Sequence, residues 1–116
     1  MSEQDVNGKA TYVNSDDPTL LLIKGNIAER EDAKKYVKRT ANAVFMVVQK
    51  HGVARLRCVG AAALNNAIKA TIIASGDAKT KGMELSIIPS FQTVDFGDSV
   101  EKTAIVLEVF DLKEDK

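Results

Sequence analysis

One stretch in the middle of the chain joins two kinds of periodicity at a single glycine. Residues 53–59 read Val-Ala-Arg-Leu-Arg-Cys-Val, in which apolar and charged side chains alternate. Alternation with a period of two predicts a strand with one apolar face. Gly60 follows, and residues 61–75 are rich in alanine, with apolar residues at helical spacing. The stretch therefore predicts a strand that passes directly into a helix.

Flanking segments extend this order of strand and helix. The continuous apolar run at residues 20–24 predicts a buried strand, and apolar positions at helical spacing predict a helix over residues 29–51, which Gly52 ends. Residues 83–88 and 103–110 predict two further strands. The predicted order is thus β-α-β-α-β-β.

Glycine and proline residues predict where the later elements end, and the apolar positions predict the buried face of the second helix. Gly76 with Asp77 is expected to end the second helix, and Pro89 to end the third strand. Gly97 with Asp98 predicts the turn within a polar loop over residues 92–102. The expected core stripe of the second helix consists of Leu64, Ile68, Thr71, Ile72 and Ser75.

The element order predicts an α+β two-layer sandwich, with two helices on one face of a four-stranded mixed sheet. A chain of 116 residues is long enough for one core. Residues 1–18 lack periodicity and predict a disordered N-terminal tail, residues 19–111 form the domain, and residues 112–116 form a C-terminal tail.

Several function classes find no support in the residues. No apolar run approaches the roughly 20 residues of a membrane span, and the polar N-terminus lacks the pattern of a secretory signal, so we expect a cytoplasmic protein without membrane contact. The lone Cys58 lies between apolar neighbours and is interpreted as a small buried hydrophobe. With one cysteine and one histidine, we expect no metal site, no cofactor and no enzymatic activity.

Charge is segregated along the chain although its formal sum is zero. Residues 1–29 hold two basic and five acidic residues, and residues 82–116 hold three basic and eight acidic ones. Residues 30–81 hold eleven basic residues against three acidic ones, a balance of +8. A cationic centre of this kind is typical of a surface that binds a polyanion.

Basic residues within this centre are the candidate phosphate contacts. Lys34 and Lys38 share a helix face with Arg30, and Lys35 lies one step round the helix. Arg55 and Arg57 project from one face of the predicted strand about 7 Å apart. Lys69 on the second helix extends the set. The alternative is that the charged helix face is merely solvated and partly paired with its acidic neighbours.

The turn at Gly60 has two interpretations. A helix N-terminus exposes backbone N–H groups, and the small residues after Gly60 leave room for a phosphate. The alternative, which we favour, is that Gly60 is a packing glycine that lets the helix lie close against the sheet, because a single glycine lacks the spacing of a phosphate-loop motif.

The first helix carries more apolar surface than one face requires. Phe45, Met46 and the residues that follow them span nearly the full helix circumference. With Ile73 of the second helix, they are the predicted oligomer interface.

Two separated motifs resemble a known family. Residues 60–70 contain Gly-Ala, Ala-Leu-Asn and Ala-Ile-Lys-Ala, and Ile-Pro-Ser-Phe at residues 88–91 is followed by Glu101, Thr-Ala-Ile at 103–105 and Leu107. In this order they resemble the stage V sporulation protein S family, small bacterial proteins related to the Alba nucleic-acid-binding fold. The resemblance covers residues 52–109.

The resemblance implies an Alba-like fold, homodimers or higher assemblies, and a role in nucleic-acid binding linked to development or gene regulation. This chain departs from Alba proteins because its second helix begins with alanines and its loop at residues 92–102 is acidic. Two main hypotheses follow, beside a minor third one, an enzyme or small-metabolite binder that uses the Gly60 turn. The first is a non-enzymatic homo-oligomer that binds the phosphate backbone of DNA or RNA. The second is a regulatory or structural protein-interaction module that acts through its apolar surface.

Overall fold

The computed structural model describes residues 13–14, 17–95 and 101–113. The element order is β1 (Val13–Asn14), β2 (Asp17–Ile23), α1 (Arg30–His51), β3 (Val53–Cys58), α2 (Ala61–Lys79), β4 (Leu85–Asp95) and β5 (Glu101–Asp111). The predicted turn at Gly97 and Asp98, most of the predicted N-terminal tail and residues 114–116 lie outside the described residues.

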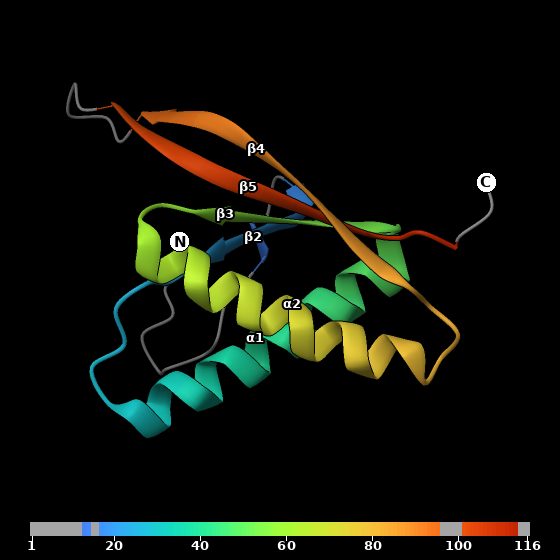
Figure 1. The fold of residues 1–116 in the computed structure, drawn as a ribbon. Helices are drawn as coiled ribbons and strands as arrows, with labels where there is room; N and C mark the ends of the chain where they lie inside the picture. Colours follow the sequence, from blue (N-terminus) through green and yellow to red (C-terminus); the bar gives the residue numbers. More distant parts are fainter. Residues whose placement is uncertain (1–12, 15–16, 96–100, 114–116) are drawn as a thin grey trace.

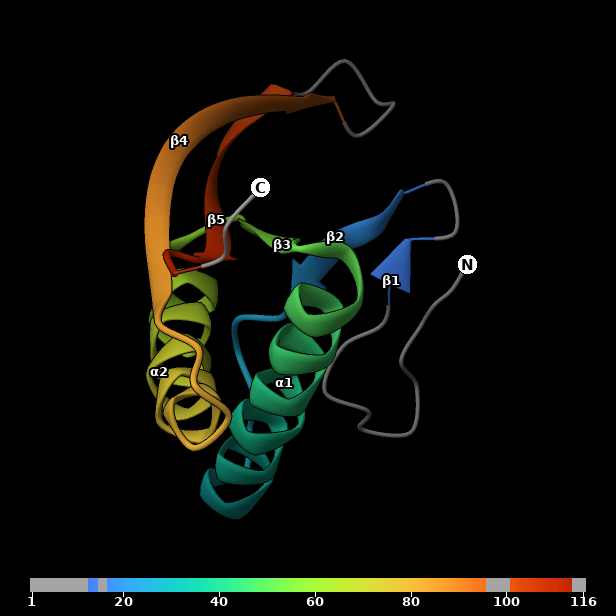
Figure 2. The same ribbon diagram turned by 90° about the vertical axis from the view of Figure 1, so that its right-hand side faces the viewer.

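All strands belong to one mixed sheet, with the order β1-β2-β3-β5-β4. β2 and β3 are parallel, and β5 is antiparallel to both β3 and β4. Both helices lie on the same face of this sheet (Figures 1 and 2). The predicted two-layer α+β sandwich is confirmed, with its four main strands and the short β1 added at one edge.

The first helix forms as its apolar periodicity predicts. Val37, Ala41, Val44 and Val48 are all buried on the face toward the sheet. Gly52 ends the helix in the left-handed conformation, with a φ of 87°, and its N–H donates to the carbonyl of Val48 at 2.8 Å. This conformation favours glycine because a side chain there would be strained.

The expected ends of α2 and β4 are wrong, because neither Gly76 nor Pro89 ends the element that contains it. α2 continues through Gly76 and ends at Lys79, since an exposed glycine weakens a helix without stopping it. β4 continues through Pro89, which pairs with Leu107 of β5. β4 is the outermost strand, and proline is tolerated at a sheet edge because its missing N–H can face outward.

β2 begins at Asp17, three residues before the expected start of that strand. The Asp17 Oδ1 atom accepts hydrogen bonds from the backbone N–H and the hydroxyl of Thr19, at 3.0 and 2.6 Å. The Asp17 carboxylate also forms an ion pair with Arg55 of the neighbouring strand β3. These contacts order the start of the strand without an apolar pattern.

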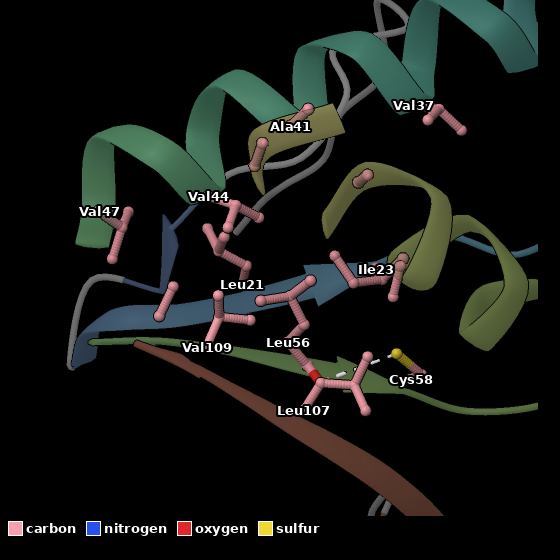
Figure 3. Close-up of a cluster of buried hydrophobic side chains, with 14 of the residues drawn as sticks. Leu21, Ile23, Val37, Ala41, Val44, Val47, Leu56, Cys58, Leu107 and Val109 are labelled. Carbon is pink, nitrogen blue, oxygen red and sulfur yellow. Dashed lines mark hydrogen bonds between the residues drawn. The ribbon is translucent and has the colours of Figure 1, made fainter. Parts of the chain in front are cut away.

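The core lies between the sheet and the two helices (Figure 3). Its largest fully buried side chains include Leu21, Tyr36 and Leu56. The expected core stripe of α2 is largely wrong, because Ile68 and Ile72 are exposed. The residues of α2 that face the sheet are mostly small, which brings the helix backbone close to the strands: Ala63, Ala67, Ala70, Thr71, Ala74 and Ala78.

Cys58 is buried in this core, as its apolar neighbours predict. Its Sγ lies 3.8 Å from the carbonyl of Leu56, and burial raises the pKa of the thiol to about 12. A thiol with this pKa stays protonated at neutral pH, so it is neither a nucleophile nor a ready metal ligand.

Candidate nucleic-acid interface

A groove lies between α1 and α2. Three basic residues of α1, spaced four apart, line it with Lys69 of α2: they are Arg30, Lys34 and Lys38. Spacing of four places side chains on one helix face, which explains why these three converge. The groove has a volume of about 520 Å³. Among the residues that the structure describes, its lining has four cations and no acidic residue.

The four cations of this groove have no partner within the part of the chain that the structure describes. No ion pair or side-chain hydrogen bond joins Arg30, Lys34, Lys38 or Lys69 to another described residue. Like charges held close together repel, so binding of an external anion would lower the electrostatic repulsion among the four cations.

The floor of the groove is apolar. Ala33 and Val37 of α1 and Ile72 and Ile73 of α2 form it. Asn66 also lines the groove, and its Nδ2 donates to the carbonyls of Lys24 and Gly25 at 3.0 and 2.9 Å. The side-chain amide of Asn66 thus holds α2 against the segment that follows β2.

Lys35 does not share this groove. It lies in a separate hollow of about 470 Å³ on another side of α1, which also includes Asp32, Tyr36, Lys24 and Arg39. The Tyr36 hydroxyl is buried there and accepts a hydrogen bond from the backbone N–H of Lys24 at 2.6 Å. The presence of Asp32 makes this hollow less cationic than the groove between the helices.

Arg55 and Arg57 lie on the opposite surface of the molecule, on the sheet face that no helix covers. The Arg55 guanidinium pairs with the Asp17 carboxylate, and its Nε donates to the Thr19 hydroxyl at 3.3 Å. The Nε of Arg57 donates to the side-chain oxygen of Gln92 at 2.8 Å. The expected orientation of both arginines is confirmed, but each already has a partner within the chain.

The structure assigns a different reason to Gly60 than close packing. Its φ is 93°, and a Cβ placed there would meet nothing within 4 Å. The packing glycine is Gly25, where a Cβ would lie 3.2 Å from the backbone nitrogen of Ala63 and 3.3 Å from the Cβ of Ala62. The N-terminal turn of α2 is therefore covered on one side by the chain itself.

The residues predicted for an oligomer interface do not form one patch. Phe45 is half-buried and packs against the core, whereas Met46 is exposed on α1. Ile73 lies on the floor of the groove between the helices. Their expected role is not tested by these positions.

The sequence analysis placed Arg30 on the same helix face as Lys34 and Lys38 but did not select it as a site residue. It also did not predict the apolar floor of the groove. The spacing of Arg30, Lys34 and Lys38 contained the first signal. The second was hidden because Ile72 was assigned to the core stripe of the second helix and Ile73 to an oligomer interface. No pattern in the sequence shows which neighbour lies beside a given helix face.

Other site types find no structural candidate among the described residues. No group of three or more His, Cys, Asp or Glu side chains there is arranged to hold a metal ion. Neither described helix is long and apolar enough to cross a membrane.

Comparison with known protein families gives a match over most of this fold. The model of the family described as stage V sporulation protein S (SpoVS) matches residues 32–112. The match includes nearly all of α1, both motifs that suggested the resemblance, and every later strand. Because it spans well over half of the 116 residues, the chain belongs to the stage V sporulation protein S family.

Proposed function

We propose that this protein is a non-enzymatic nucleic-acid-binding protein that acts in the cytoplasm as a homo-oligomer. The observation that carries the proposal is the groove between α1 and α2, where Arg30, Lys34, Lys38 and Lys69 converge with no acidic residue among the described lining residues. The ligand is the phosphate backbone of DNA or RNA.

The distribution of charge between the two layers supports this surface over the sheet. The helices α1 and α2 together carry eight basic and three acidic residues, whereas the strands carry three basic and five acidic ones. A polyanion is therefore attracted to the helical layer and repelled from the sheet.

The chemistry of the groove favours binding without strong sequence preference. Lysine contacts phosphate oxygens as a point charge, and phosphate contacts carry no direct sequence information. Base edges are read mainly by amide or guanidinium groups in a groove of the duplex. The one amide that lines this groove, in Asn66, already donates to backbone carbonyls.

The proposal is tested by fluorescence anisotropy with a labelled DNA duplex and a labelled single-stranded RNA at two salt concentrations. Four phosphate contacts predict a loss of affinity of roughly 100-fold between about 50 and 200 mM salt, because binding releases condensed counterions. A triple variant with Lys34→Glu, Lys38→Glu and Lys69→Glu should lose measurable binding at the lower salt.

A matched variant controls for net charge alone. Lys50→Glu with Lys79→Glu and Lys81→Glu also reverses three exposed lysines, but none of them lines the groove. We expect it to retain most of the affinity. Absence of binding by the unmodified protein at the lower salt, or equal losses in the two triple variants, contradicts the proposal.

The apolar floor of the groove favours a second candidate, a protein-interaction module. An acidic amphipathic segment would place apolar side chains on Val37, Ile72 and Ile73 and its carboxylates on the surrounding lysines. Ile73→Ser separates the two candidates. Phosphate binding should change little in this variant, whereas capture of an acidic amphipathic peptide should fall by about tenfold or more, since a buried apolar anchor is lost.

A further inference from the structure

The groove between α1 and α2 presents apolar surface that phosphate contacts do not use. Ile72 and Ile73 line this groove, and their side chains are 66% and 37% exposed. Phosphate oxygens are charged and strongly hydrated, so they gain nothing from contact with an isoleucine. Exposed isoleucines beside cations therefore point to a ligand that carries apolar surface as well as negative charge.

The cations and the apolar surface occupy facing walls of one groove. Lys69 of α2 precedes Ile72 and Ile73 by three and four residues, so the three side chains share one helix face. α1 lies beside α2 and carries a cation at every fourth residue from Arg30 to Lys38, about 6 Å apart along the helix axis (Figure 2). One wall is thus a row of cations, and the other combines a cation with two isoleucines.

A single-stranded nucleic acid has the chemistry that matches these walls. Its phosphates repeat along the backbone, and each unpaired base offers a flat face that packs against a side chain. A duplex keeps those faces stacked inside and presents phosphates, sugars and base edges. Contact with a base face tolerates any sequence, because every base has such a face. The apolar wall therefore favours a single strand over a duplex.

The exposed aromatic side chain of β4 is a weaker candidate for contact with a base. Phe91 lines a hollow of about 430 Å³ that also includes the carboxylates of Asp17 and Glu108. The two arginines of this hollow already have partners within the chain. A strand placed there would bring its phosphates close to two acidic groups, which repel them.

We propose that the groove binds single-stranded DNA or RNA in preference to a duplex, with the face of one base packed on Ile72. The phosphates on either side of this base contact the cations of α1 and Lys69 of α2. The inference rests on the proposed function, because the same cations hold the phosphates. It adds the selection of a single strand and a base contact at Ile72.

The test compares three labelled ligands of about 12 nucleotides in length by fluorescence anisotropy at about 50 mM salt. They are an oligothymidylate, the same sugar-phosphate strand without bases, and a duplex. The two single strands carry equal charge, so the difference between them reports the bases. The unmodified protein should bind the oligothymidylate about fivefold or more tighter than the strand without bases, and also tighter than the duplex.

Two matched variants test the role of Ile72. Ile72→Ser should lower the affinity for the oligothymidylate to that for the strand without bases. The salt slope should not change, because the lost contact is apolar and releases no counterion. Met46→Ser removes an apolar side chain of similar exposure, 65%, from α1 outside the groove and should keep the affinity of the unmodified protein.

The outcomes separate this inference from the proposed function. If none of the three ligands binds, the proposed function fails and this inference fails with it. If they bind through their phosphates, the proposed function stands. The inference alone is then overturned by equal affinity for the strands with and without bases, by tighter binding of the duplex, by an unchanged Ile72→Ser affinity or by an equal loss in Met46→Ser. Equal affinity for the two strands would leave the apolar floor to the acidic peptide of the second candidate function.

Discussion

The helical layer and the sheet of this protein both present cations, but the cations of the groove between the helices have no side-chain partner among the described residues, whereas the two arginines of β3 do. Lys34 and Lys38 face solvent beside other cations, whereas Arg55 is paired with Asp17 and Arg57 donates to Gln92. The difference follows from geometry. A helix face takes its side chains from one segment, which is basic here, whereas a sheet face places side chains from separate strands beside one another. The number of cations in a segment therefore does not show how many remain available for a ligand.

Loss of the hydrogen bonds that join Asn66 of α2 to the segment after β2 should have the largest effect on stability. Asn66→Ala removes two hydrogen bonds and leaves the carbonyls of Lys24 and Gly25 without that donor. Because Asn66 is buried, we expect a loss of about 2–3 kcal/mol in the free energy of unfolding, measured by urea denaturation.

Asn65→Ala is the matched control, because Asn65 is adjacent and exposed. Alanine has the higher helix propensity, so this variant should be neutral or slightly stabilising. Equal losses of stability in the two variants would show that the packing of α2 against the sheet does not depend on the Asn66 hydrogen bonds.

A substitution at Gly60, where the chain passes from β3 to α2, should have the next largest effect on stability. Its φ of 93° is strained for any residue with a side chain, so Gly60→Ala should cost about 1–2 kcal/mol of unfolding free energy although the added methyl group has open space. Gly76→Ala inserts the same group into open space within α2 and should stabilise the protein by about 0.5–1 kcal/mol. Thermal unfolding of both variants tests whether the backbone conformation at residue 60 requires glycine. A Gly60→Ala protein as stable as the unmodified one would show that this conformation does not require glycine.

Local patterns predicted the elements well where the structural cause is itself local. The alternation in β3 placed Leu56 and Cys58 in the core and both arginines on the other face, and α1 buries the apolar positions that define its period. Pattern reasoning failed for α2, because its fit against the sheet needs alanine, and large residues that look like core are left outside.

The candidate site depended on facts that no local pattern contains. Proline ends a central strand but not an edge strand, and only the sheet order identifies β4 as the edge. Likewise, the cations at residues 34, 38 and 69 converge because α1 and α2 lie side by side, while Lys35 turns to another hollow one step round the helix. The partners of Arg55 and Arg57 come from β2 and β4, which are distant along the sequence.

The smallest expected effect is on nucleic-acid affinity when the sheet arginines are neutralised. Arg55→Gln with Arg57→Gln should change the affinity for a DNA duplex by less than about threefold, since side chains already held by chain partners contribute little to an external phosphate contact. Lys34→Gln with Lys38→Gln removes the same charge from the groove and should cost about tenfold or more and reduce the salt slope by about two. The two double variants have equal net charge, so a difference between them reports position alone. Equal losses, or a larger loss for the arginine pair, would mean that the Asp17 and Gln92 contacts yield to phosphate and that the sheet face belongs to the binding surface.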